Sequence, residues 1–271
     1  MGLHLTFKNS IEIPMEAETL SPDRLEGLSA KAAAKLSVQY GNASAPLGDF
    51  FEVAETAHDE MRLSGDLSRV KLVGAGMSRG RIQIEGDIGQ HLGATMTGGE
   101  IMVEGNAGDW VGPEMRGGRI EIRGDAGHAV GSAYRGSRVG MAGGEIMVHG
   151  RAGNEVGNSL RNGLIAIGGD CGDFAGVNLL AGTIIVLGAL GIRAGAGMKR
   201  GTIVAMGPTE ILPTFTYACR YRPDFLRLYL MRLRALGLTI DDAQIAGAYN
   251  RWSGDSVELN RGEILVYDGA A

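Results

Sequence analysis

The sequence predicts an all-β fold: a single-stranded, right-handed parallel β-helix of about seven coils, with an N-terminal α/β cap and a C-terminal helical cap. Glycine recurs every nineteen residues, with one step of twenty-six, in four columns that keep the same phase. The first column contains Gly80, Gly99, Gly118, Gly144, Gly163, Gly182 and Gly201. A unit this short that lacks helical periodicity suits one coil, whose strand pairs with its equivalent one turn later. Right-handedness is expected from the usual chirality of parallel crossovers.

Alternating apolar residues lie between the first two glycines of each unit and predict a short strand with one buried face. We expect one inward column formed by Ile82, Ile101, Ile120, Ile146, Ile165 and Ile184. A further inward column is assigned to Met96, Met115, Tyr134, Leu160, Leu179 and Met198. Each column should form one ladder in a continuous core.

The step of twenty-six residues indicates an insertion of seven in one repeat. Five residues normally join the fourth glycine to the next coil, whereas residues 132–143 provide twelve. Insertions in repeat proteins form loops, often on a binding face. We therefore expect a protruding loop at 132–143, either a neutral surface insertion or one whose Arg135 and Arg138 contact an acidic partner.

The two ends of the chain depart from the repeat and should cover the ends of the core. We assign residues 1–58 to an N-terminal cap, with a strand over 3–13 and a helix over 24–35. Residues 59–208 form the repeat region. Residues 209–271 form a C-terminal cap with a helix over 223–236, which starts at Pro223 and stops at Gly237, and a final strand over 263–267.

Basic residues concentrate near the C-terminal helix, although the chain carries a formal net charge of −5. Arg220, Arg227 and Arg234 recur every seven residues and would share one face where this stretch is helical. Such a face suits an acidic partner surface or a polyanionic ligand; a merely solvated face is the alternative. The net charge gives no nucleic-acid signature, and no apolar run is long enough to span a membrane. We expect a cytoplasmic protein, because the N-terminus shows no export signal.

No arrangement of polar residues predicts catalysis or metal binding. The five histidines (His4, His58, His91, His128 and His149) occupy different repeat positions and do not form a ligand ladder. Cys171 and Cys219 are far apart, and Cys171 falls in a core column. We therefore expect no catalytic residue and no metal site in this chain.

Acidic or amide side chains follow the second glycine column in several repeats. Asp66, Asp87, Asn106, Asp125 and Asp170 occupy this position, but Arg151 and Ala189 interrupt it. A calcium-binding β-roll needs carboxylates in every repeat. Local Asx turns at the corners are the better interpretation.

The recurrent unit Gly-Glu/Arg-Ile-x-Val/Ile-x-Gly-x-x-Gly-x-x-Val/Leu-Gly resembles the GXGXG domain. That domain is shared by the C subunit of formylmethanofuran dehydrogenase, its bacterial formyltransferase/hydrolase counterpart, and the C-terminal region of the glutamate synthase large subunit. The resemblance covers nearly the whole chain, including residues 16–23, Gly41-Asn42 and 47–51. The chain carries no amidotransferase, flavin or cluster domain, which argues against a glutamate synthase.

The resemblance implies a non-catalytic scaffold subunit of a bacterial complex that converts formyl-tetrahydromethanopterin, through formyl-methanofuran, to formate in one-carbon oxidation. It implies hydrolase-type, dehydrogenase-B-like and formyltransferase subunits as partners, a methanofuran-type carrier and tetrahydromethanopterin as cofactors, and metal in another subunit. Arg outnumbers Lys by twenty-one to five, which suggests a GC-rich genome and favours the bacterial complex. The C subunit of a molybdenum or tungsten formylmethanofuran dehydrogenase and a stand-alone carbohydrate-active β-helix are the alternatives.

Overall fold

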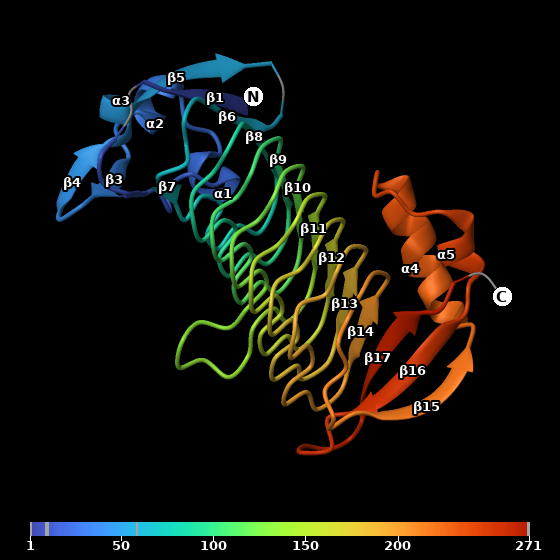
Figure 1. The fold of residues 1–271 in the computed structure, drawn as a ribbon. Helices are drawn as coiled ribbons and strands as arrows, with labels where there is room; N and C mark the ends of the chain where they lie inside the picture. Colours follow the sequence, from blue (N-terminus) through green and yellow to red (C-terminus); the bar gives the residue numbers. More distant parts are fainter. Residues whose placement is uncertain (1, 9–10, 58, 270–271) are drawn as a thin grey trace.

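A computed structural model describes residues 2–8, 11–57 and 59–269 of the 271-residue chain. Most strands belong to one thirteen-stranded sheet with the order β15-β16-β17-β14-β13-β12-β11-β10-β9-β8-β6-β1-β5. The pairs β1/β5, β15/β16 and β16/β17 are antiparallel, and the other neighbours run parallel. Figure 1 shows the repeats stacked side by side between the N-terminal segment and the C-terminal strands and helices.

The N-terminal segment forms a small sheet and three one-turn helices beside the first repeats. Its strands are β1 (Gly2–Phe7), β2 (Met15–Glu16), β3 (Ser37–Tyr40), β4 (Ala43–Pro46) and β5 (Phe51–Thr56). Its helices are α1 (Pro22–Leu25), α2 (Ala30–Ala33) and α3 (Leu47–Phe50). A second sheet has the order β4-β3-β2-β7, where β7 is Val70–Lys71. The single helix expected over 24–35 is therefore wrong, because Gly27 at positive φ separates α1 from α2.

Each repeat contributes one short strand to the large sheet. These strands are β6 (Met61–Ser64), β8 (Arg81–Glu85), β9 (Glu100–Val103), β10 (Arg119–Ile122), β11 (Glu145–Val148), β12 (Leu164–Ile167), β13 (Thr183–Val186) and β14 (Thr202–Ala205). A second position pairs from repeat to repeat through isolated parallel bridges, from Leu67↔Ile88 to Cys171↔Leu190. The nineteen-residue period therefore keeps equivalent residues in register.

The C-terminal segment adds three strands and two helices. These are β15 (Thr216–Tyr221), α4 (Asp224–Ala235), α5 (Asp242–Ala246), β16 (Tyr249–Gly254) and β17 (Gly262–Tyr267). Strand β17 pairs in parallel with β14, so that Ile264 continues the column of Ile203.

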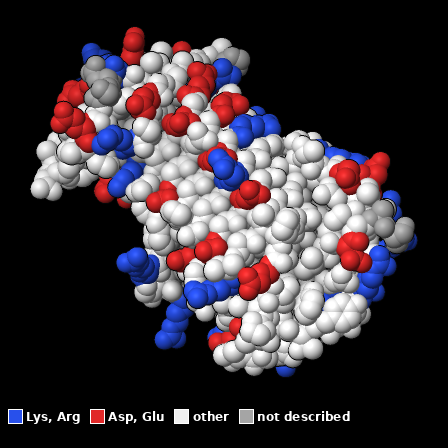
Figure 2. Space-filling model, viewed as in Figure 1, with Lys and Arg blue, Asp and Glu red and all other residues white. Residues whose placement is uncertain are grey.

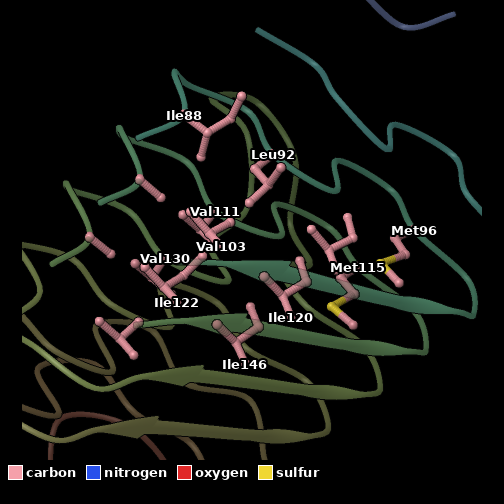
Figure 3. Close-up of a cluster of buried hydrophobic side chains, with 14 of the residues drawn as sticks. Ile88, Leu92, Met96, Val103, Val111, Met115, Ile120, Ile122, Val130 and Ile146 are labelled. Carbon is pink, nitrogen blue, oxygen red and sulfur yellow. The ribbon is translucent and has the colours of Figure 1, made fainter. Parts of the chain in front are cut away.

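The core lies inside the stacked repeats, on one face of the parallel strands. The predicted inward column is confirmed: Ile82, Ile101, Ile120, Ile146, Ile165 and Ile184 are neighbours in register and are buried. Figure 3 shows isoleucine, valine and methionine side chains of successive repeats packed together in this core. Burial of such continuous apolar ladders is the main stabilising contribution to a repeat structure.

The assignment of Tyr134 to the methionine column is wrong. Met141 is the buried residue in that repeat, between Met115 and Leu160, whereas Tyr134 is half-buried at the surface. Because the seven extra residues precede Met141, the column resumes only after the insertion. The expected protruding loop at 132–143 is confirmed, and Figure 1 shows it projecting from the stack near the middle of the repeats.

Two neighbouring glycines at one corner of the repeat are needed for different physical reasons. Gly118 has φ +90°, in the left-handed region that favours glycine. At Gly117, an added Cβ would lie 2.3 Å from the backbone oxygen of Thr97 in the preceding repeat. Gly118 is therefore required by backbone conformation, and Gly117 by the close approach of the preceding repeat.

The predicted fold class is wrong. The chain forms one large, mixed and mostly parallel sheet with few helices. Strands β15, β16 and β17, rather than a helical cap, complete its C-terminal end. The physical reason is that β17 offers both backbone hydrogen bonds and an inward apolar residue in register with β14, so it extends the sheet as another repeat strand would.

Helix α4 covers the outer face of the later strands instead. Leu226, Leu230 and Leu233 are buried against a second core. The strand residues of this second core are Met147, Leu164, Ala166, Ile185, Val204 and Leu265. Outward positions that are charged or polar in the early repeats, such as Arg62 and Gln83, are apolar in these later ones. This change of polarity is the sequence signal that a helix covers only the later strands.

Candidate functional site

The predicted basic face brings together two of its three arginines on one element. Arg227 and Arg234 lie on α4, but Arg220 lies on β15. Arg220 Nε donates to Asp268 Oδ2 at 2.5 Å, and this bond lowers the pKa of the Asp268 carboxyl below its ordinary value. Arg234 Nη1 donates to Asp242 Oδ1 at 2.6 Å. Arg227 is exposed and has no ion pair within the described part of the chain.

The outward face of α4 is also apolar. Leu228 is 72% exposed, Met231 44% and Phe225 40%. The buried leucines at 226, 230 and 233 lie on the opposite side of the helix. The face that turns away from the sheet therefore combines exposed apolar side chains with the Arg227 guanidinium.

A buried carboxylate lies on the outer face of β10, and sequence reasoning missed it. The Glu121 side chain is 3% exposed. Its Oε1 lies 2.9 Å from Arg123 Nη2 and 3.1 Å from His149 Nε2, and Arg119 lies 3.8 Å from its second oxygen. A buried carboxylate is tolerated when such partners compensate its charge. The alternation Arg-Ile-Glu-Ile in β10 placed Glu121 on the outward face. Its neighbours there are Arg119, Arg123 and His149, with Met147 beside it on β11, and sequence spacing does not reveal this enclosure.

A hollow lies between the N-terminal segment and the first repeats. It is an open hollow of about 680 Å³, lined by apolar residues such as Leu25 and Met61 and by Glu26, Glu55 and Arg79. Arg79 is ion-paired with Glu26 across its rim. The Arg81–Glu100 pair, at 2.8 Å, lines a smaller neighbouring hollow that reaches Glu121.

The Asx residues of the repeats serve as connectors between repeats. Asp87 Oδ1 accepts from the backbone N–H of Asn106 at 2.7 Å, and Asn106 Oδ1 accepts from that of Asp125 at 2.8 Å. The local Asx turn predicted for this column is found at Asp66, which accepts from Ser68 N–H. At Asp87, Asn106, Asp125 and Asp170 the prediction is wrong, because the side-chain oxygen accepts from the backbone N–H of the equivalent residue in the next repeat.

A second ladder of the same kind explains one histidine. Asp109 Oδ1 accepts from the backbone N–H of His128 at 2.7 Å, and His128 Nδ1 accepts from that of Asn154 at 2.9 Å. Asn154 continues the ladder to Asp173. His128 therefore takes the place of an Asx residue.

An aromatic cluster at the base of the insertion loop was also missed. The rings of Trp110 and Tyr134 stack with centroids 5.1 Å apart, and His91 packs against both. His91 Nδ1 lies 3.0 Å from the Tyr134 hydroxyl. Burial raises the pKa of Tyr134 to about 12 and lowers that of His91, so both are neutral near pH 7. Because Tyr134 was assigned to the core, its contacts with His91 and Trp110 were not foreseen.

The remaining predicted candidates lie apart from one another. His4 Nε2 contacts Ser64 Oγ at 2.9 Å, and His58 lies outside the described residues. Cys171 is buried and Cys219 exposed. Within the described ranges, no three His, Cys, Asp or Glu side chains are grouped so that they could hold a metal ion. The same ranges contain no helix long and apolar enough to cross a membrane.

These arrangements include two exposed surfaces. Glu121, His91 and His128 are engaged in structural bonds, whereas the outward face of α4 and the insertion loop remain exposed. Exposed arginines and large apolar side chains are typical of protein interfaces. This geometry best supports contact with other macromolecules.

Comparison with known proteins gives the family. The model of the GXGXG motif family matches residues 60–215. The C subunit of molybdenum-containing formylmethanofuran dehydrogenase 1 from Methanothermobacter marburgensis is 48% identical over 94 residues, which are 34% of this chain and 24% of that protein. The C subunit of the formyltransferase/hydrolase complex Fhc from Methylorubrum extorquens is 38% identical over 73 residues, or 27% of this chain and 28% of that protein. The matched segments thus span about a quarter of these relatives' own length.

A solved structure matches over a much larger extent. It is the crystal structure of the formyltransferase/hydrolase complex FhcABCD from Methylorubrum extorquens in complex with methylofuran. One of its chains is similar with a TM-score of 0.89 and 36% identity, over 97% of this chain and 98% of that chain. The chain therefore belongs to the GXGXG family, among the relatives that include the C subunits of formylmethanofuran dehydrogenase and of the formyltransferase/hydrolase complex.

Proposed function

We propose that this chain is the C subunit of a formyltransferase/hydrolase complex and that it holds other subunits in place. The complex would convert formyl-tetrahydromethanopterin, through a formylated methanofuran-type carrier, to formate in the cytoplasm. The observation that carries this proposal is the match of nearly the full length of both chains to a subunit of the FhcABCD complex.

A molybdenum or tungsten formylmethanofuran dehydrogenase is the second candidate. The identity to its C subunit is higher, at 48%, but it extends over only 94 residues. The GXGXG repeats alone could account for a match of that length. The whole-length likeness favours the hydrolase complex, because it includes both ends of the chain.

The proposed role is structural, with catalysis, the carrier and any metal in other subunits. What supports this role is the use of the polar side chains within the chain itself. The Asx residues connect repeats, and Glu121 is enclosed by Arg119, Arg123 and His149. Within this subunit we propose residues 1–58 as the N-terminal cap, 59–208 as the repeat region and 209–271 as the C-terminal segment.

The contact with hydrolase-type, dehydrogenase-B-like or formyltransferase subunits is proposed to include the outward face of α4. Arg227 is the leading residue on this face; Arg234 lies on the same helix, and Arg220 lies on β15. Their guanidinium groups suit carboxylates of an acidic partner or of a glutamate-rich carrier tail, because arginine forms bidentate pairs with them.

Copurification tests the assignment. A tagged chain isolated from its native lysate should bring down formyltransferase and hydrolase-type subunits, identified by mass spectrometry. Recovery of a molybdenum or tungsten pterin subunit instead would establish the second candidate, and recovery of the chain alone would refute both.

The Arg227→Glu/Arg234→Glu double variant tests the α4 surface. We expect less complex and less formate release, with a larger loss at low salt, where repulsion between like charges is least screened. The charge-matched control is Arg24→Glu/Arg261→Glu, at two exposed positions outside α4. Wild-type recovery and activity of the α4 variant at both salt levels would show that this face is only solvated.

A further inference from the structure

The insertion loop, residues 132–143, contains seven residues more than the equivalent connection in other repeats, and the core does not need this extra length. The Met141 N–H donates to Gly131 O at 2.9 Å, which joins the two ends of the protruding part. Met141 then enters the core, fully buried, at the place that Met115 occupies one repeat earlier. The residues between Gly131 and Met141 could be shortened to the normal connection without loss of a core residue.

The base of the loop is nevertheless firmly held. Ser132 Oγ donates to Glu155 O at 2.7 Å, and the Tyr134 N–H donates to Glu114 Oε1 at 3.3 Å. Tyr134 stacks on Trp110 at 5.1 Å and contacts His91 through its hydroxyl. These contacts come from repeats on both sides, so the loop leaves the stack in a fixed direction.

The tip of the loop is basic, although Glu114 and Glu155 lie at its base. Arg135 and Arg138 are exposed on the loop itself. Arg116 and Arg161 are exposed in the neighbouring repeats: the Ala142 N–H donates to Met115 O and the Arg161 N–H to Met141 O, which places both arginines beside the base of the loop. Figure 2 shows basic side chains projecting where Figure 1 shows the loop.

These four arginines differ from most others in the chain. Arg79, Arg119 and Arg251, for example, are paired with carboxylates of the chain itself. Arg116, Arg135, Arg138 and Arg161 have no ion pair among the residues that the structure describes. We call these four arginines the loop patch.

The arrangement of the loop patch fits a protein interface. A loop that is already ordered loses less conformational entropy when it binds, so more of the contact energy appears as affinity. Arginine, tyrosine and tryptophan are the residues enriched at energetic hot spots. The guanidinium groups match carboxylates in charge and geometry. Figure 1 shows the loop on the side of the stack away from α4, so both surfaces can be occupied at once.

We propose that the loop patch docks onto a carboxylate-bearing surface of a partner subunit, separate from the contact proposed for α4. This inference rests on the proposed function as part of a hetero-oligomeric complex. A subunit that links others needs at least two binding surfaces, and the loop patch supplies the second.

Zero-length cross-linking in the assembled complex tests the contact directly. Arg138→Lys keeps the charge and places a primary amine on the loop, and a carbodiimide joins amines to carboxylates in contact. We expect a cross-link, identified by mass spectrometry, from residue 138 to an Asp or Glu of another subunit. The matched control, Arg24→Lys, should not give the same linkage. The proposal is overturned if residue 138 links only to its own chain or to no carboxylate.

Charge reversal tests the energetic weight of the loop patch. Arg135→Glu/Arg138→Glu should lower complex recovery by about tenfold at moderate salt, because attraction to carboxylates becomes repulsion. The control Arg24→Glu/Arg261→Glu should assemble as the wild type does. Tyr134→Ala, which leaves the arginines but removes their anchor, should give an intermediate loss. Normal recovery of the charge-reversed complex would refute the proposal.

The wild-type complex separates the two hypotheses. If the wild-type chain copurifies with partner subunits and the loop variants do so equally, the inference about the loop fails and the proposed function stands. If the wild-type chain copurifies with nothing, the proposed function fails first. Binding of a small polyanion by the wild-type complex but not by the Arg135→Glu/Arg138→Glu complex, with no cross-link from residue 138 to another subunit, would identify the patch as a ligand site and overturn the proposed protein contact.

Discussion

Ile146 lies in the middle of the inward isoleucine column, between Ile120 and Ile165, and is 1% exposed. Its surroundings contain apolar side chains from the repeats on both sides. A carboxylate at this position would have no partner and no water. The continuity of the column therefore makes each member sensitive to charge.

Ile146→Asp should lower the free energy of unfolding by more than about 3 kcal/mol, because it buries an uncompensated charge. Ile146→Val removes only one methylene group and should cost about 1 kcal/mol. Chemical denaturation of both variants beside the wild type measures the difference. Equal losses for Asp and Val would mean that the site admits water and that the ladder is not a closed core.

The two cysteines differ in reactivity for a physical reason. Cys171 is buried among the repeats, and burial raises the pKa of its thiol to about 12. Thiolate is the reactive form, so Cys171 stays protonated and shielded at ordinary pH. Cys219 on β15 is exposed.

One thiol per native chain should therefore react with a soluble disulfide reagent at about pH 8. Cys219→Ser should abolish this reaction, while Cys171→Ser should leave it unchanged. Unfolding in denaturant should expose the second thiol and raise the count for the wild type. Rapid modification of Cys171 in the native Cys219→Ser chain would contradict the burial of this column.

The Asx columns show what can and cannot be predicted at single residues. Their position after glycine indicates a corner, and the structure places them at corners. The acceptor role of Asp87 was also foreseeable, but its donor, the Asn106 N–H, lies nineteen residues away. The distance between successive repeats decides between a local turn and a bond to the next repeat, and this distance is set by packing of the whole stack.

At the level of elements, helix α4 illustrates how a correctly predicted segment can be wrongly placed. Pro223 and Gly237 bound the helix as expected. The position of α4 depends on which surface of the repeats is apolar. The outward positions of the later repeats are apolar, as the inward positions are. Ile185 and Val204 point outward from β13 and β14 and pack under Leu230 and its neighbours.

Leu230→Ala should therefore lower the free energy of unfolding by about 3 kcal/mol, since it opens a cavity between α4 and the sheet. Leu228→Ala, two residues earlier on the exposed side, should change it by less than about 0.5 kcal/mol. Chemical denaturation provides both values. If the Leu228 variant proved the more destabilised, the helix would be rotated relative to the structure described.

At the level of the whole molecule, the repeat could be predicted and the ends could not. The glycine and isoleucine columns recur in seven repeats, so an atypical residue in one repeat does not obscure the pattern. The ends of the chain do not repeat. From the sequence, β17 is predicted as a strand without a known partner, whereas in the structure it continues the sheet beyond β14. For the candidate surfaces, heptad spacing placed Arg227 and Arg234 on one helix but could not show that β15 contains Arg220.

Several polar groups of the described residues are engaged in bonds within the chain, as the proposed structural role requires. Glu121 is surrounded by cationic partners, His128 accepts a backbone N–H, and His91 contacts the Tyr134 hydroxyl. A general acid or base must instead be free to exchange a proton with substrate. In a linking subunit these groups stabilise the fold, and activity depends on where the other subunits are held.

The isolated chain should therefore release no formate from a formylated carrier and should contain less than one metal ion per chain. The assembled complex, measured in the same formate assay, is the positive control, and elemental analysis of the purified chain provides the metal content. Adding the isolated wild-type chain to a complex lacking it should restore formate release, because the contribution of the chain is to bring the subunits together. Formate release by the chain alone, or one tightly held metal ion per chain, would show that it contains a reaction centre of its own.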